Sequence, residues 1–282
     1  MNYTTLINAT TLHQNLNTPD WVIIDSRFSL ADTEAGAKAY RQGHIPEARY
    51  AHLDKDLSST ITSVTGRHPL PDFRLLAEKL GQWGISNNSQ VIVYDDASGI
   101  FAGRLWWLLR SLGHEKVAVL DGGLKHWQKL GLPITTTLPS PTPSTFRAYL
   151  NEGAWLNAIQ VQNRLAQKNI CLIDARTPER FRGEQEPIDP VAGHIPGAMN
   201  RPFQKNLDSD GLFLTAGQLR QQFKQLLGNT LPEQVVHTCG SGVTACHNLL
   251  AMEHAGLTGS KLYAGSWSEW IRNKNRAVGG CP

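Results

Sequence analysis

The segment Ile170-Cys171-Leu172-Ile173-Asp174-Ala175-Arg176 repeats the pattern of Trp21-Val22-Ile23-Ile24-Asp25-Ser26-Arg27. Each copy is a short apolar run that ends in an aspartate, with an arginine two residues later. Runs of this length and composition are typical of buried strands in a parallel sheet. A strand repeated in this way in the two halves of the chain predicts two domains of one kind.

Three further blocks recur in the same order on either side of the middle of the chain. They are Gly43-His44-Ile45-Pro46 with Gly193-His194-Ile195-Pro196, Val91-Ile92-Val93-Tyr94-Asp95-Asp96 with Gln234-Val235-Val236-His237-Thr238-Cys239, and Leu120-Asp121-Gly122-Gly123 with Tyr263-Ala264-Gly265-Ser266. The spacing is also kept: Asp96 precedes Trp127 by 31 residues (127 − 96), and Cys239 precedes Trp270 by 31 (270 − 239). Four matched blocks in one order indicate an internal duplication.

Within each copy, short β-branched runs alternate with longer stretches of helical periodicity. Residues 73–83 and 219–227 carry apolar side chains at helical spacing. Alternating strands and helices predict an α/β fold: two tandem domains, each a largely parallel sheet flanked by helices.

A proline-rich segment marks the boundary between the two copies. Residues 135–145 contain three prolines among small polar residues, a composition that suits neither a helix nor a central strand. We therefore expect an N-terminal domain over residues 1–138, a linker over 139–148 and a C-terminal domain over 149–282.

Composition narrows the class of protein. The 282 residues are 40% hydrophobic and 18% charged with a net charge of +3, which indicates a soluble globular chain. The charge is too small for nucleic acid as main partner, and no apolar run or basic-flanked start suggests a membrane or secretory segment. The four cysteines form no CxxC pair and no zinc-ligand spacing, so we expect a reduced, cytoplasmic setting with no metal and no cofactor.

The loop Cys239-Gly240-Ser241-Gly242-Val243-Thr244 lies between an apolar strand and a helix expected to begin near Thr244. Ligands of parallel sheets bind where strands hand over to helices in this way. Two glycines allow the loop backbone to turn several N–H groups inward, and the helix adds the positive end of its dipole. These surroundings favour a thiolate at neutral pH and would hold the anionic sulfur of a persulfide.

Two other interpretations of Cys239 are weighed against this one. An isolated cysteine is most often a buried structural thiol, but such a thiol has no need of an anion-binding loop. A cysteine phosphatase would place an arginine six residues after the cysteine to bind phosphate, and that position is Ala245. The loop thus favours sulfur transfer.

Taken together, the repeats and this loop resemble the tandem-domain rhodanese family over nearly the whole chain. The neutral Cys-Gly-Ser-Gly-Val-Thr loop is similar to that of the 3-mercaptopyruvate sulfurtransferase branch, whereas the thiosulfate-preferring branch has basic residues at the second and third loop positions. The resemblance implies a sulfurtransferase that takes sulfur from 3-mercaptopyruvate on Cys239, passes it to a thiol such as thioredoxin or to cyanide, and releases pyruvate. Two alternatives stay open: a thiosulfate:cyanide sulfurtransferase and a non-catalytic rhodanese-like binding module.

The resemblance also implies roles for individual residues. Arg182 would bind the donor carboxylate, and the loop residues Gly240, Gly242, Val243 and Thr244 would bind the sulfur anion. Asp54, His68 and Ser241 would form a relay that moves a proton to or from the donor. The branch usually has a second arginine soon after the first, and residues 184–190 contain no basic residue.

Several residues that look chemical are expected to be structural. His44 and His194 occur in both copies and are expected to hold loops through backbone hydrogen bonds, while Asp25 and Asp174 are expected to tie down strand ends. Asp96 occupies the place of the cysteine in the first copy, which is therefore expected to be catalytically silent. Cys246 is expected to be packed, and Cys281 is assigned no role.

Overall fold

The computed structural model describes residues 2–280, and Cys281 lies outside them. The chain divides into two compact units. The N-terminal unit comprises residues 2–59, 70–151 and 210–212, and the second unit comprises residues 60–69, 152–209 and 213–280. The short segment 60–69 is therefore grouped with the second unit, although it lies in the first half of the sequence.

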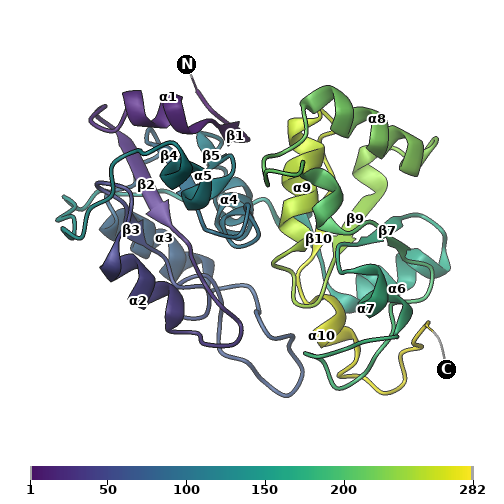
Figure 1. Ribbon diagram of the computed structural model, residues 1–282. Helices are drawn as coiled ribbons and strands as arrows, with labels where there is room; N and C mark the ends of the chain where they lie inside the picture. Colours follow the sequence, from purple (N-terminus) through teal and green to yellow (C-terminus); the bar gives the residue numbers. More distant parts are fainter. Residues whose placement is uncertain (1, 281–282) are drawn as a thin grey trace. The chain divides into compact units, whose positions relative to one another are not determined.

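The N-terminal unit is built on a five-stranded parallel sheet in the order β1-β5-β4-β2-β3 (Figure 1). Its strands are β1 (Leu6–Ile7), β2 (Trp21–Asp25), β3 (Arg49–Tyr50), β4 (Gln90–Tyr94) and β5 (Val117–Leu120). Its helices are α1 (Ala9–Gln14), α2 (Ala35–Gln42), α3 (Phe73–Gln82), α4 (Ala102–Ser111) and α5 (Gly123–Lys129).

The second unit repeats this arrangement, with a parallel sheet in the order β6-β10-β9-β7-β8. Its strands are β6 (Trp155–Leu156), β7 (Cys171–Asp174), β8 (Met199–Asn200), β9 (Val235–Thr238) and β10 (Lys261–Tyr263). Its α-helices are α6 (Ala158–Ala166), α7 (Pro178–Arg182), α8 (Ala216–Leu227), α9 (Ala245–His254) and α10 (Ser266–Trp270). Three short 3-10 helices complete it: η1 (Glu152–Ala154), η2 (Phe203–Asn206) and η3 (Pro232–Gln234).

The two sheets have the same strand order, so the internal duplication and the predicted α/β class are confirmed. Differences from the expected bounds are small. The helix predicted over 73–83 ends at Gln82, with Trp83 as its C-cap, and the helix expected near Thr244 begins at Ala245 with Thr244 as its N-cap.

Each sheet buries alternate side chains on one face under a pair of helices. In the N-terminal unit, Ile23 and Ile92 of the sheet pack with Leu12 of α1 and Trp127 of α5. In the second unit the corresponding cluster contains Val236 of β9, Val161 of α6 and Trp267 of α10. Because side chains alternate across a strand, this packing leaves the other face of each sheet to the remaining helices.

Helix α9 shows how the opposite face of the second sheet is covered. It packs against β9, β10, α8 and η2, and every residue from Ala245 to Met252 is buried. A helix enclosed on nearly all sides is rigidly held. The N-terminus of α9 therefore has a well-defined position directly after the cysteine loop.

The duplicated aspartates form the predicted structural ties at the strand ends. Asp25 binds Arg27 through both carboxylate oxygens, with Arg27 Nη2 at 2.7 Å from Oδ2. Asp174 and Arg176 make the same contact at the same distance. Each arginine also donates to a glycine carbonyl of the block that contains the repeated histidine.

The repeated histidines also hold local structure. The Nδ1 atom of His44 lies 2.7 Å from the carbonyl oxygen of Tyr40, and that of His194 lies 2.7 Å from the carbonyl oxygen of Phe181. Both contacts match the expectation that these histidines hold loops through the backbone.

The proline-rich segment has no helix or strand over residues 136–151. Its backbone is nevertheless anchored to the N-terminal unit, because Ser144 N donates to Gly81 O and Tyr149 N to Leu112 O. The predicted boundaries at 138 and 149 remain predictions. Within residues 2–280, no helix combines the length and apolar character needed to cross a membrane.

Candidate active site

Cys239 is the first residue after β9 and is only 2% exposed. Its Sγ accepts a hydrogen bond of 3.2 Å from the backbone N–H of Gly242. Gly242 has a φ of +77°, and a Cβ at that position would lie 2.1 Å from the carbonyl oxygen of Ala264. A glycine is therefore required for the loop to turn its N–H onto the sulfur.

The first turn of α10 holds the loop from the other side. Ser266 Oγ accepts from the N–H of Cys239 at 3.0 Å, while Trp267 N donates to Cys239 O and Ser268 N donates to Gly240 O. This anchorage fixes the carbonyl groups away from the sulfur. The sulfur thus faces a backbone N–H and the N-terminus of the ten-residue helix α9, both of which stabilise negative charge.

The rest of the loop has structural contacts that explain its composition. Val243 is buried, and its carbonyl accepts from Cys246 N at 3.0 Å. Cys246 is buried as expected, and its Sγ donates to the carbonyl of Gly242 at 3.4 Å. Ser241 Oγ lies 2.7 Å from Nδ1 of His68, and both residues are buried.

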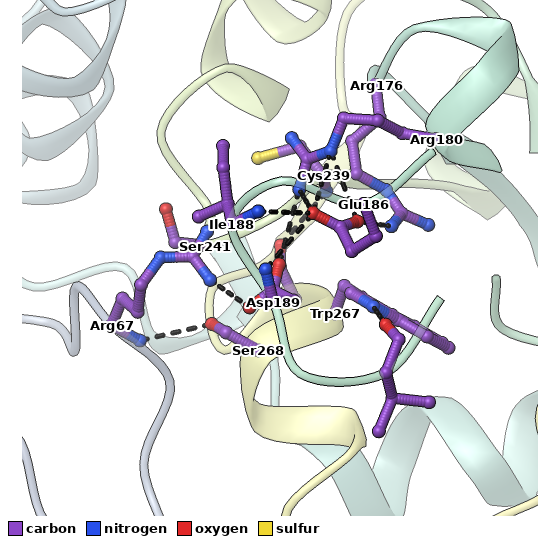
Figure 2. A network of polar contacts seen from close by, with 12 residues as sticks. Arg67, Arg176, Arg180, Glu186, Ile188, Asp189, Cys239, Ser241, Trp267 and Ser268 are labelled. Carbon is purple, nitrogen blue, oxygen red and sulfur yellow. Dashed lines mark hydrogen bonds and ion pairs between the residues drawn. The ribbon is translucent and has the colours of Figure 1, made fainter. Parts of the chain in front are cut away.

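A chain of alternating charges lies beside the loop (Figure 2). Arg176 pairs with Asp174 and Glu186, and Arg180 pairs with Glu186 at 2.7 Å and with Asp189 at 3.2 Å. Arg67 makes an ion pair with the other oxygen of Asp189. The acidic groups therefore hold the guanidinium groups of three arginines in fixed positions next to Cys239.

The electrostatics of this network follow from burial and pairing. Burial disfavours the anion of Glu186, but hydrogen bonds from Arg180 and from backbone N–H groups outweigh it and lower the pKa. Burial also disfavours the cation of Arg176, yet Asp174 and Glu186 raise its pKa, with Cys239 a further contribution in the same direction. Burial raises the pKa of Asp189, against the opposing charge of Arg67.

Two of the arginines lie directly over the second loop residue. A Cβ placed on Gly240 would lie 2.9 Å from Nη2 of Arg67 and 3.5 Å and 3.7 Å from the two terminal nitrogens of Arg180. A glycine at this position leaves the guanidinium groups in contact with the loop backbone. Cationic groups suited to an anionic substrate therefore lie beside the cysteine loop.

A family model decides the classification. The model of the rhodanese-like domain matches residues 8–130 and again residues 157–273. The chain belongs to the rhodanese family. Its duplicated sheet and its single cysteine loop are those of a two-domain member.

Named relatives of this rhodanese are sulfurtransferases. It is 49% identical over 275 residues to the "Probable 3-mercaptopyruvate sulfurtransferase" of Pseudomonas aeruginosa, with 97% of each chain covered. It is 34% identical to the thiosulfate sulfurtransferase of Rattus norvegicus, covering 90% of this chain and 86% of that protein. The crystal structure of SseA from Escherichia coli, titled as a 3-mercaptopyruvate sulfotransferase, matches with a TM-score of 0.81 at 31% identity, covering 95% of this chain and all of that one. The predicted family, branch and enzyme class are confirmed: this rhodanese is a sulfurtransferase.

The structure places the predicted carboxylate-binding arginine elsewhere than expected. Arg182 is 51% exposed and pairs with Glu184 at 2.6 Å. Residues 180 and 182 are two positions apart on α7, so they point to nearly opposite sides of the helix. Arg180, not Arg182, faces the loop of this rhodanese.

The relay predicted around Ser241 is visible in part. His68 and Ser241 are in contact within the second unit, as given above. Asp54 lies in a turn of the N-terminal unit, where its N–H donates to Nδ1 of His52 at 3.1 Å. The participation of Asp54 stays a prediction.

Arg67 and Arg180 were not identified from the sequence. The signal for Arg180 was present but ambiguous, since two arginines flank Phe181 and only helix geometry distinguishes them. The signal for Arg67 was its position next to His68, already assigned to the site. Neither composition nor spacing reveals that its guanidinium reaches Gly240.

The first copy of the loop has its anion-binding groups already occupied. The last strand residue there is followed by Asp95, whose Oδ1 accepts from the N–H groups of Ala97 and Gly99 and whose Oδ2 accepts from those of Phe101 and Ala102, at 2.8–2.9 Å. The equivalent residue of the second copy is the uncharged Thr238. The loop after β4 therefore binds its own carboxylate, and Asp96 stands there in place of the cysteine.

No group of three or more histidine, cysteine or acidic side chains suited to a metal occurs within residues 2–280. None of Cys171, Cys239 and Cys246 forms a disulfide.

Proposed function

We propose that this sulfurtransferase takes its sulfur from 3-mercaptopyruvate and carries it as a persulfide of Cys239. The observation that carries the proposal is the contact between Cys239 Sγ and the N–H of Gly242 beneath two guanidinium groups. It combines a stabilised sulfur anion with a binding site for a carboxylate. A reduced, cytoplasmic setting is part of the proposal.

In the first step the Cys239 thiolate attacks the donor sulfur, and the sulfur–carbon bond breaks with its electron pair going to carbon. The donor thiol loses one proton, and the resulting enolate of pyruvate takes up one proton at carbon. The products are therefore the Cys239 persulfide anion and pyruvate. Two anions react and two anions result. The contact of Ser241 with His68 provides a path for this proton close to the reacting sulfur.

In the second step an acceptor thiolate attacks the outer sulfur of the persulfide. The sulfur–sulfur bond breaks with its electron pair returning to Cys239, which is a thiolate again. Acceptor and outer sulfur leave as a new persulfide. A thiol such as that of thioredoxin would serve, and cyanide would leave as thiocyanate.

Arg180 is proposed to bind the donor carboxylate. Its planar guanidinium is held by Glu186 and Asp189 and reaches the loop at Gly240. A guanidinium group can bind a carboxylate through two parallel hydrogen bonds, which an ammonium group cannot do. This assigns to Arg180 the role that the sequence analysis gave to Arg182.

Intact mass measurement after incubation with 3-mercaptopyruvate tests the persulfide directly. We expect the wild-type chain to gain one sulfur atom and Cys239→Ser to gain none. Absence of the gain in the wild type, with formation of pyruvate also absent, would reject the proposal and favour a binding module.

The donor and its arginine are tested by steady-state kinetics. We expect a higher kcat/KM with 3-mercaptopyruvate than with thiosulfate, and we expect Arg180→Lys to lower the value for 3-mercaptopyruvate at least tenfold. Arg182→Lys is the matched comparison, because that arginine pairs with a carboxylate at the surface. A greater loss in Arg182→Lys would restore the first assignment, and a preference for thiosulfate would make the chain a thiosulfate sulfurtransferase.

A further inference from the structure

Residues 60–69 form a strap that is docked on the first turn of α10, and on Arg272 beyond the end of that helix. Arg272 Nε donates to the carbonyl of Thr65 at 3.2 Å, and Arg67 N donates to Ser268 Oγ at 3.1 Å. Gly66 lies so close that a Cβ on it would be 2.5 Å from the carbonyl of Gly265. The strap is thus held by the same turn that anchors Cys239 and Gly240.

The strap places the side chain of Arg67 next to Gly240 of the cysteine loop. Its Nη2 atom and the terminal nitrogens of Arg180 approach the same point, the Cβ position of Gly240. The side chain of Arg67 is 22% exposed, so a ligand can reach it from solvent. Two guanidinium groups therefore converge where a donor anion would arrive.

Asp189 fixes the relative position of these two groups. Its side chain is 3% exposed, with one oxygen bound to Arg67 and the other to Arg180. The neighbouring residue is Ile188, and the whole stretch 184–190 lacks a basic side chain. The second guanidinium group at Gly240 is therefore that of Arg67, which comes from the strap, more than a hundred residues earlier in the chain than Arg180.

We infer that Arg67 is a second donor-binding residue, which binds the carboxylate of the α-keto acid donor together with Arg180, and that Asp189 is a positioning residue for both. The inference rests on the proposed function and extends it to the source of donor specificity. Two guanidinium groups held at a fixed separation select a planar carboxylate of the right reach from the sulfur. The binding of a donor without a carboxylate therefore does not depend on Arg67.

The test compares the wild-type chain with Arg67→Lys, which keeps the charge and removes the planar fork. We expect the KM for 3-mercaptopyruvate to rise at least fivefold while kcat falls less than threefold, because binding is weakened before chemistry. Persulfide loading from inorganic polysulfide, a donor with no carboxylate, should stay within twofold of the wild type. Arg74→Lys, an exposed arginine of α3 paired with Glu78, controls for the exchange itself.

Asp189→Asn provides a second variant with a separate expectation. It keeps the shape of the side chain but removes the negative charge that Arg67 and Arg180 share, while Glu186 still holds Arg180. The KM for 3-mercaptopyruvate should therefore rise while loading from polysulfide persists. An unchanged KM in both variants would overturn the inference. If the wild type itself formed no persulfide from 3-mercaptopyruvate but loaded from polysulfide, the proposed donor would fail instead, and the two failures are therefore distinguishable.

A second, separate feature is a pocket of about 540 Å³ between η2 and α8. It is lined by polar side chains and three leucines: Arg201, Lys205, Gln222, Gln225, Leu207, Leu214 and Leu226. Arg201 is only 4% exposed. A volume of this size suits a small organic ligand.

Arg201 is a buried cation without an anion. Its Nη2 donates to the side-chain oxygens of Asn206 at 2.9 Å and Gln222 at 3.0 Å, and its guanidinium carbon lies 4.1 Å from the centre of the Phe223 ring. Within residues 2–280 no carboxylate pairs with Arg201, and its buried Nε has no hydrogen-bond partner. Buried charges are normally neutralised by a partner, and burial lowers the pKa of Arg201 to about 10.

We propose that this pocket binds a small carboxylate with a short aliphatic body. The carboxylate would neutralise Arg201, with the cation of Lys205 at the exposed rim, and the aliphatic body would contact Leu207, Leu214 and Leu226. The combination of a desolvated cation with an apolar wall excludes both purely apolar molecules and strongly hydrated inorganic anions as preferred ligands.

Hexanoate is the probe, titrated calorimetrically into Cys239→Ser so that no sulfur chemistry occurs. We expect saturable binding of hexanoate, no binding of the neutral hexan-1-ol, and binding of phosphate at least tenfold weaker. Leu226→Trp, which fills the pocket without altering Arg201, should abolish hexanoate binding, and the exposed exchange Lys205→Gln should weaken it severalfold. No binding to the parent chain, or unchanged binding to Leu226→Trp, would remove the proposal.

Discussion

Gly242 is the residue on which the geometry of the cysteine loop depends. Its φ of +77° lies in a region that a side chain disfavours, and a Cβ would collide with the carbonyl of Ala264. We expect Gly242→Ala to destabilise the chain by about 2 kcal/mol or more and to slow persulfide formation at least tenfold, because the N–H is displaced from Cys239. Urea denaturation and stopped-flow loading measure the two effects.

Gly217 in α8 is the matched control for that substitution. Nothing lies within 4 Å of a Cβ built there, and its backbone is helical. Gly217→Ala should leave activity unchanged and stabilise the helix by up to about 1 kcal/mol. Equal effects at the two positions would show that the loop tolerates a side chain.

His237, two residues before Cys239, makes stability depend on pH. It is fully buried on β9, and burial together with the charge of Arg201 lowers its pKa to about 3. The unfolded chain binds a proton at this residue below about 6.5 and the folded chain does not, so stability is lost as pH falls through the window from 6.5 to 3. This residue alone should cost about 2 kcal/mol between pH 7 and pH 5.

The measurement is urea denaturation of the wild type and of His237→Leu at pH 7 and pH 5. The variant should lose less of its free energy of unfolding than the wild type over that interval. Parallel losses in the two chains would assign the acid sensitivity to other groups.

At the scale of elements, the loop after β4 and the loop after β9 share a backbone arrangement but differ in the group that it binds. Both turn backbone N–H groups inward ahead of a buried helix. The first closes around its own carboxylate at Asp95, and the second leaves its N–H groups to the sulfur of Cys239. The first loop is therefore closed by its own carboxylate, whereas the second holds a thiol.

Replacement of Asp95 tests this structural role. Asp95→Ala leaves four backbone donors without their acceptor, and we expect a loss of about 3 kcal/mol or more in the free energy of unfolding. Asp96→Ala, at a half-buried position, should cost less than about 1 kcal/mol. Thermal denaturation followed by circular dichroism compares them, and similar costs would mean that the loop does not depend on the Asp95 carboxylate.

At the scale of the whole molecule, the catalytic unit is not a continuous stretch of sequence. The C-terminal copy contains its own sheet, its own apolar core and Cys239, but His68 and Arg67 belong to the strap at residues 60–69. The half of the sequence that has Asp96 in place of the cysteine therefore still supplies side chains that contact the cysteine loop.

A chain limited to residues 149–282 tests this dependence. It should retain helical and strand content, because the core of the second unit lies within it, and Cys239 should still be loaded by polysulfide. Its kcat/KM for 3-mercaptopyruvate should be at least tenfold lower than that of the full chain, since it lacks His68 and Arg67. Full activity in the short chain would remove the strap from the mechanism.

Much of the fold was predictable because its signals are local or repeated. The apolar runs at residues 22–24 and 235–236 mark strands by composition, and matched blocks mark the duplication. The place of Cys239 after a strand and before a helix follows from the same reading. The direction of the side chains on α7 could not be predicted in this way, since two arginines flank Phe181 and the short helix turns them to opposite sides.

The amino-acid sequence by itself determined two α/β units of one pattern, the cysteine loop in the second, and a first copy without the cysteine. These properties depend on residue type and spacing along the chain. The tertiary structure alone decided that Arg180 and not Arg182 faces Gly240, that Arg67 joins it from residues 60–69, and that Asp95 occupies the loop of the first copy. Each of these depends on contacts that chain folding creates, where side-chain direction and long-range docking, rather than sequence proximity, bring charges together.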